Sequence, residues 1–201
     1  MNNSIDADVS YCIGLNIAEN LKSQNLGNLD VDNFLDGMKA LLDNKTPKFT
    51  NQEVGEILQA YFEKKSQEEF AEFKDQGEAF LKHNASKNGV YVTASGLQYE
   101  IISQGSGDKP ESHSMVSVHY HGTLIDGTVF DSSYERGNPA QFGLNQVIAG
   151  WTEGLQLMNA GSKFRFYIPQ DLAYGANPHP QSPIKPYMAL VFDVELLEIL
   201  A

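Results

Sequence analysis

The apolar residues change their spacing at Asn88-Gly89, and this change divides the chain into two parts. Before it, apolar residues recur every three or four positions, which is typical of amphipathic helices. After it, they alternate with polar residues, which is typical of strands with one buried face. We therefore predict an α+β protein with a helical domain, residues 1–88, followed by a domain built on an antiparallel sheet, residues 89–201.

Two short helices are expected at the start of the helical part. Residues 9–21 carry one apolar stripe at spacings of three and four. Asp32 or Asn33 would cap a second helix, which would end at Thr46-Pro47.

A much longer helix is expected to follow. Thr50 and Glu53 form a capping-box pattern, and the apolar stripe after them continues to about Asn84 without a proline. This pattern predicts one helix over about residues 50–84, roughly 50 Å long at 1.5 Å per residue, which connects two bodies. The sequence leaves open whether Gly55 and Gly77 mark close helix packing.

The short helices cannot cover all the apolar surface of the long one. The excess predicts self-association, most simply as a two-fold homodimer through residues 1–88. A monomeric bundle is the alternative.

The second part reads as strands around one helix. Residues 115–124, 164–168 and 190–197 alternate apolar and polar side chains. Asp126-Gly127 predicts a two-residue hairpin, and Gln146–Met158 predicts the one helix of this part.

Composition narrows the possible partners. The net charge is −12, so nucleic acid and anionic membrane surfaces are not expected to bind. Cys12 is the only cysteine; we expect it on a buried helix face, and it excludes an intrachain disulfide. The N-terminus has no basic segment or apolar run, which predicts a cytoplasmic protein, or a periplasmic one whose signal peptide has been removed.

Conventional catalytic motifs are scarce. His119 and His121 share one face of a strand, but no third metal ligand follows at a recognisable spacing, so a solvated pair is favoured over a metal site. No nucleophile elbow, phosphate loop or dinucleotide fingerprint occurs, and we expect neither metal nor cofactor. His179 could act as a general base or simply be exposed.

Aromatic residues gather in the second part, many outside regular strands or at strand ends. Asp131 lies among them, directly after Phe130, and a buried carboxylate needs a partner, for which Arg136 is the nearest candidate. The residues alone leave a plain aromatic core open as the alternative. The aromatic set comprises Tyr120, Phe130, Tyr134, Phe142, Trp151, Tyr174, Tyr187 and Phe192.

Four segments, taken in order, resemble the signatures of FK506-binding-protein-type (FKBP) peptidyl-prolyl isomerases. They read VHYHGTLIDGTVFDSSYERGNP, VIAGWTEGLQLMNAGSKFRFYIP, DLAYGA and LVFDVELLEIL. The segment from YCIGLNIAENL through the long helix resembles the helical dimerisation region of the bacterial Mip-like and FklB-like branch. The resemblance implies a V-shaped homodimer and an antiparallel sheet wrapped around a short helix.

The resemblance also implies a set of site residues. Tyr120, Asp131, Ile148 and Tyr174 would be catalytic. Trp151 would form the floor of an apolar pocket, with Phe130, Arg136, Phe142, Val147, His179, Ile184 and Phe192 binding substrate. Two departures stand out: Ala140 replaces an aromatic residue and would open one wall, and loop 175–187 contains extra prolines and Lys185.

The implied activity is isomerisation of X-Pro bonds in unfolded or partly folded polypeptides, with FK506-type macrolides as ligands. The implied mechanism desolvates and twists the amide without proton transfer. A dimeric folding chaperone that grips clients between two long helices is the main alternative. A scaffold with an inactive pocket is another.

Overall fold

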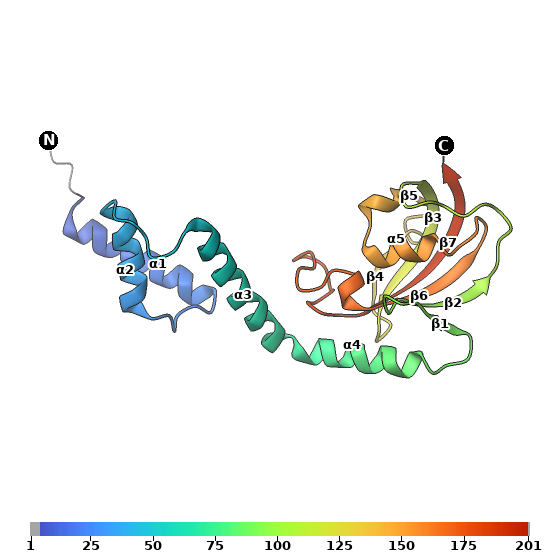
Figure 1. Ribbon diagram of the computed structural model, residues 1–201, viewed down its shortest axis with the longest axis horizontal. Coiled ribbons are helices and arrows are strands. Elements are labelled where there is room, and N and C mark those ends of the chain that lie inside the picture. The colour runs from blue at the N-terminus through green and yellow to red at the C-terminus, as the bar shows by residue number, and fades with distance from the viewer. Residues whose placement is uncertain (1–4, 201) are drawn as a thin grey trace. The chain divides into compact units, whose positions relative to one another are not determined.

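The computed structural model describes residues 5–200 (Figure 1). The chain divides into two compact units, of which the first ends at Leu58 and the second begins at Gln59. Helices make up the first part and an antiparallel sheet the second, so the predicted α+β class is confirmed. The predicted domain boundary at 88/89 lies inside the second unit and stays a prediction. Residues 1–4 and 201 of the predicted domains lie outside the described range.

The first unit contains α1 (Ala7–Ser23) and α2 (Val31–Leu42), and α3 (Asn51–Glu69) begins in it. The cap of α2 is Asp30, not Asp32 or Asn33, because its carboxylate accepts the Asn33 N–H at 3.1 Å. The helix ends at Leu42, before the predicted end at Thr46-Pro47.

The predicted capping box at α3 is confirmed. The Thr50 N–H donates to the Glu53 carboxylate at 2.8 Å, and the Glu53 N–H donates to the Thr50 hydroxyl at 3.3 Å.

Apolar side chains of this unit are exposed within the single chain. None of the residues in α1, α2 and α3 is buried. Cys12 is exposed as well, contrary to the expectation that it would occupy a buried helix face. The surface carries large apolar residues, among them Val9, Ile13, Leu41, Leu42 and Ile57.

The predicted long helix is divided into two. The backbone leaves the helical region at Phe70 (φ −112°, ψ 18°), and α4 (Ala71–Asn84) begins after it. No proline causes the break. From Ala71 onward the helix is held by tertiary contacts of Gly77, Phe80 and Asn84 with the sheet, which the helical pattern of the sequence does not reveal.

Within the described residues, seven strands form one antiparallel sheet. The order is β1-β2-β6-β7-β3-β4, and β5 also pairs with β3. The strands are β1 (Val90–Val92), β2 (Gln98–Ser103), β3 (Met115–Leu124), β4 (Val129–Ser132), β5 (Ala140–Gly143), β6 (Lys163–Ile168) and β7 (Leu190–Leu200).

Helix α5 (Ala149–Leu155) lies on the inner face of this sheet (Figure 1). It is shorter than the predicted Gln146–Met158, because residues 144–146 form a 3-10 turn and Val147 and Ile148 are extended. A second 3-10 turn, Gln170–Leu172, follows β6.

Two glycines of α5 bring the helix close to the strands. A Cβ at Gly150 would lie 2.6 Å from Ile168, and one at Gly154 would lie 2.7 Å from Phe166. Ile168 and Phe166 are both fully buried, so neither can move aside cheaply.

The predicted inner face of β3 is confirmed, although Ser117, which alternates to the other face, is buried as well. Val116, Val118, Tyr120 and Leu124 of β3 are buried. The hairpin differs from the prediction: its turn is centred on Ile125 and Asp126, since the Gly127 N–H donates to the Leu124 carbonyl, and Gly127 follows with φ 90°.

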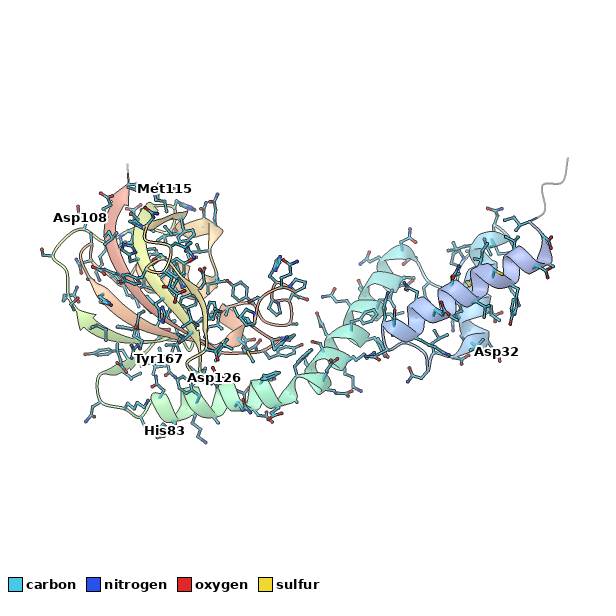
Figure 2. The ribbon with its side chains drawn as sticks, turned by 180° about the vertical axis from the view of Figure 1, so that it is seen from behind. Asp32, His83, Asp108, Met115, Asp126 and Tyr167 are labelled. Carbon is cyan, nitrogen blue, oxygen red and sulfur yellow. The ribbon has the colours of Figure 1, made fainter. Side chains whose placement is uncertain are left out.

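Tyr167 of β6 alternates with the inward Phe166 and Ile168, yet it is only 6% exposed. Phe80 of α4 packs on its ring at 5.9 Å. Figure 2 shows Tyr167 and Asp126 on the side of the sheet next to α4. Within residues 5–200, no helix has both the length and the apolar character that a membrane span needs.

Candidate active site

A cavity of about 560 Å³ opens between α5, strands β3, β4, β5 and β7, and the loop that precedes β7. Every residue predicted for the site lines it except Arg136, which is paired with Asp131. The lining residues are Tyr120, Phe130, Asp131, Phe142, Gln146, Val147, Ile148, Trp151, Tyr174, His179, Gln181, Ser182, Pro183, Ile184 and Phe192.

Trp151 is surrounded by three aromatic rings. The centroids of Tyr120 and Phe192 lie 5.2 Å from its ring and that of Phe142 lies 5.7 Å away, all nearly perpendicular to it. Such edge-to-face contacts are favourable, and they leave Trp151 only 4% exposed. Strand alternation places Tyr120 and Phe192 on the inner face, where α5 presents Trp151.

One charged network lies beside these rings. The Tyr120 hydroxyl donates to Asp131 Oδ2 at 2.5 Å and accepts from Arg136 Nη2 at 2.7 Å. Arg136 Nη1 is paired with Asp131 Oδ1, and its guanidinium lies 5.4 Å from the Tyr120 ring centroid. The predicted pairing of Asp131 with Arg136 is therefore present, and it neutralises the carboxylate.

The pKa values of both tyrosines of the site are raised, mainly by burial. Burial, followed by the bond to Asp131, raises the pKa of Tyr120 above its usual 10.0. Burial and the negative charge of Asp131 likewise raise the pKa of Tyr174. Each hydroxyl thus remains a hydrogen-bond donor throughout the neutral range.

A backbone donor lies at the start of α5. Ile148 is the N-cap residue of this helix (φ −58°, ψ 149°), and its carbonyl accepts from the Trp151 N–H at 2.9 Å. N–H groups at a helix start have no acceptor within the helix. Because Ile148 also lines the cavity, its N–H is a candidate donor to a bound ligand.

The loop of residues 175–187, called the late loop, forms the remaining wall of the cavity. The Ser182 N–H donates to the His179 carbonyl at 2.9 Å, and the Ile184 N–H donates to the Ser182 hydroxyl at 3.1 Å. Ile184 is 6% exposed. Gln146, Gln181, Ser182 and Pro183 were not predicted, and the only signal for them was their position beside predicted residues. Ala140 pairs with Val118 and packs on the core, but it does not line the cavity.

The two histidines of β3 lie outside the cavity. A ring nitrogen of His119 is 3.0 Å from the Ser133 hydroxyl, and the ring stacks on Tyr134 at 4.6 Å. His121 pairs with Asp193 of β7 and Ser132 of β4 across the sheet. Among residues 5–200, no three His, Cys, Asp or Glu side chains are grouped closely enough to hold a metal.

Two family models match the chain. The model described as FKBP-type peptidyl-prolyl cis-trans isomerase covers residues 107–197, and the model of the domain amino terminal to it covers residues 6–101.

Several known proteins align with nearly the whole length of this chain. The FKBP-type 22 kDa peptidyl-prolyl cis-trans isomerase of Escherichia coli is 44% identical, covering 98% of this chain and 97% of that one. FkpA of Aeromonas hydrophila is 45% identical over 98% of this chain and 77% of its own. The crystal structure of FkpA from Escherichia coli matches with a TM-score of 0.64 and 35% identity, covering 98% of this chain and 97% of that one.

Proposed function

The chain belongs to the FKBP-type peptidyl-prolyl cis-trans isomerases, and we propose that the cavity floored by Trp151 is where it catalyses the isomerisation of X-Pro bonds. The supporting observation is that one cavity combines the apolar floor at Trp151 with the paired carboxylate of Asp131. Two possible donors, the Ile148 N–H and the Tyr174 hydroxyl, belong to residues that line the same cavity. The similarity shows the enzyme class, and we propose the roles of the individual residues from the contacts of the cavity.

The uncatalysed reaction is slow because the peptide bond has partial double-bond character. The barrier is about 18–20 kcal/mol, and unaided isomerisation takes tens to hundreds of seconds. Water bonded to the amide carbonyl favours the planar, polar form. An environment that removes this water destabilises the planar forms more than the twisted one, and each 1.36 kcal/mol of selective stabilisation raises the rate about tenfold.

The apolar residues of the cavity would provide this environment. Tyr120, Trp151 and Phe192 would hold the proline ring and exclude water from the amide. Phe130, Phe142, Val147 and Ile184 would complete the walls, and His179 would contact the substrate at the rim.

Polar groups would orient the substrate. The Ile148 N–H and the Tyr174 hydroxyl would donate to substrate carbonyls, while Asp131 would place a fixed negative charge near the rotating carbonyl carbon. Arg136 and Tyr120 would hold Asp131 in position, as their hydrogen bonds indicate. These steps need no nucleophile and no proton transfer.

A proline-limited refolding assay tests the proposal. The full chain should accelerate the slow refolding phase, and an FK506-type macrolide should abolish the acceleration while changing the fluorescence of Trp151, the only tryptophan. Acceleration that is indifferent to the macrolide, with unchanged fluorescence, would place the activity elsewhere.

We also propose a homodimer through residues 1–88. The exposed apolar side chains of α1, α2 and α3 support it, because a monomer in water rarely leaves so many large apolar side chains exposed. Leu41→Asp and Ile57→Asp should give monomers in sedimentation equilibrium, whereas Lys45→Asp, which alters a polar surface residue, should leave the mass of the dimer unchanged.

The same surface favours a second candidate function, binding of partly folded clients. The monomeric variants separate it from catalysis, since their mutations lie outside the unit that contains the cavity. A chaperone role requires slower refolding of a protein substrate with unchanged isomerisation of a tetrapeptide. Unchanged rates on both substrates would remove that role. The expected cytoplasmic location stays a prediction without support from the relatives.

A further inference from the structure

Helix α4 packs on the chain directly after the late loop of the cavity. Gly77 is buried, and a Cβ added to it would lie 3.2 Å from Ala189 Cβ and 3.4 Å from Ala189 N. Its backbone is helical, so no unusual φ requires glycine there. Since glycine costs a helix about 1 kcal/mol relative to alanine, its presence is best explained by the close approach to Ala189.

The C-terminal half of α4 is anchored to the sheet. The Gln98 side chain donates to the Leu81 carbonyl at 2.9 Å and accepts from Asn84 Nδ2 at 3.0 Å. Gln98 is 4% exposed and Asn84 is fully buried. Together with the packing of Phe80 on Tyr167, these bonds restrict any shift of the helix, so a larger side chain at position 77 must displace Ala189.

Ala189 follows the base of the loop by two residues. Tyr187 there has φ 63°, the left-handed region that non-glycine residues rarely adopt. It is buried, and its N–H donates to the Gly175 carbonyl at 2.9 Å, which closes loop 175–187. Such a conformation persists only when its surroundings hold it, and the packing of α4 on Ala189 belongs to those surroundings.

We propose that Gly77 is a positioning residue for the cavity. By leaving room for Ala189, it lets α4 hold the base of loop 175–187 and thereby keeps Ile184 in the cavity wall. This inference rests on the proposed location of catalysis in the cavity.

A small crevice beside the contact leaves room for Met188 and Ala189 to move. It measures about 80 Å³ and is lined by Phe73, Gln76, Leu124, Ile125, Asp126, Met188 and Ala189. Because this space lies next to Met188 and Ala189, that segment can yield without unfolding of the sheet. The expected effect is therefore displacement of the loop and not loss of the fold.

Full-length Gly77→Ala and Gly77→Leu test the proposal, with Gly55→Ala and Gly55→Leu as matched controls. Gly55 also lies within a helix, but a Cβ there meets nothing within 4 Å. Tetrapeptide kcat/KM and macrolide affinity are measured per folded molecule, with circular dichroism giving the folded fraction. We expect both to fall roughly threefold in Gly77→Ala and about tenfold in Gly77→Leu, with no change in the controls.

A rescue variant identifies the route. Gly77→Ala combined with Ala189→Gly moves one methyl group across the contact and should restore kcat/KM, which a general loss of stability would not allow. Wild-type values in folded Gly77→Leu, or a loss in Gly77→Ala that Ala189→Gly does not relieve, would overturn the proposal. An inactive wild-type chain would instead refute the proposed site.

Discussion

Removing one oxygen atom from the cavity tests whether the charged network serves catalysis. Tyr120→Phe keeps the ring that packs 5.2 Å from Trp151 but deletes the hydroxyl that joins Asp131 and Arg136. Asp131 and Arg136 remain directly paired, so no charge is left without a partner. The substitution therefore isolates the contribution of the hydroxyl.

The expected loss of stability depends on how exposed the partners of the Tyr120 hydroxyl are to water. A hydrogen bond to a charged group is worth about 1.5–3 kcal/mol when well shielded. Here the side chains of Asp131 and Arg136 are 41% and 50% exposed, so water replaces part of what is lost. We expect a loss of about 1 kcal/mol in the free energy of unfolding. If the transition state loses the same stabilisation of about 1 kcal/mol, kcat/KM falls about fivefold.

Urea unfolding followed by Trp151 fluorescence gives the stability, and a tetrapeptide assay gives kcat/KM. Tyr134→Phe is the matched control, because its hydroxyl bonds Glu195 at 2.9 Å outside the cavity. It should cost stability without changing kcat/KM. Equal kcat/KM in Tyr120→Phe and wild type would show that the hydroxyl does not position Asp131 for catalysis.

Three further outcomes are expected. Trp151→Ala should lower the free energy of unfolding by about 3–5 kcal/mol and abolish macrolide binding in calorimetry, since it removes a buried ring with three aromatic neighbours. Asp131→Leu should fold by circular dichroism yet lose about tenfold or more in kcat/KM; full activity would exclude a catalytic role for the carboxylate. Burial and the bond to Glu195 raise the pKa of Tyr134 to about 12, so its contribution to stability is complete below pH 10 and is lost as the pH rises through 12. Tyr134→Phe should therefore lose less stability than wild type between these pH values, as measured by urea titration; parallel losses would contradict this.

Hydrophobic periodicity correctly predicted the inner face of the sheet. Period-two alternation places Tyr120 and Phe192 inward, because strand geometry leaves side chains only two faces. The family resemblance then supplied the residues that alternation cannot reach, such as Ile148, whose proposed role belongs to its backbone.

Predictions failed where tertiary contacts outweigh local preference. The helical pattern shows no signal at Phe70, since the end of α3 and the start of α4 are both good helix sequence. Tyr167 alternates outward, yet α4 covers it. Gln181 and Ser182 lie in an irregular loop without periodicity, so only the three-dimensional structure places them at the cavity.

Two glycines of α5, on either side of Trp151 in the sequence, restrict which substitutions the floor of the cavity can accept. Gly150 and Gly154 let the backbone of α5 pack directly on Ile168 and Phe166. Because both of these side chains are fully buried, they fix how deep the floor of the cavity lies. A mutation there alters the whole core at once. His179 and Gln181 of loop 175–187 line the cavity but are exposed, so new substrate preferences can arise at these positions while the floor that holds the proline ring is retained.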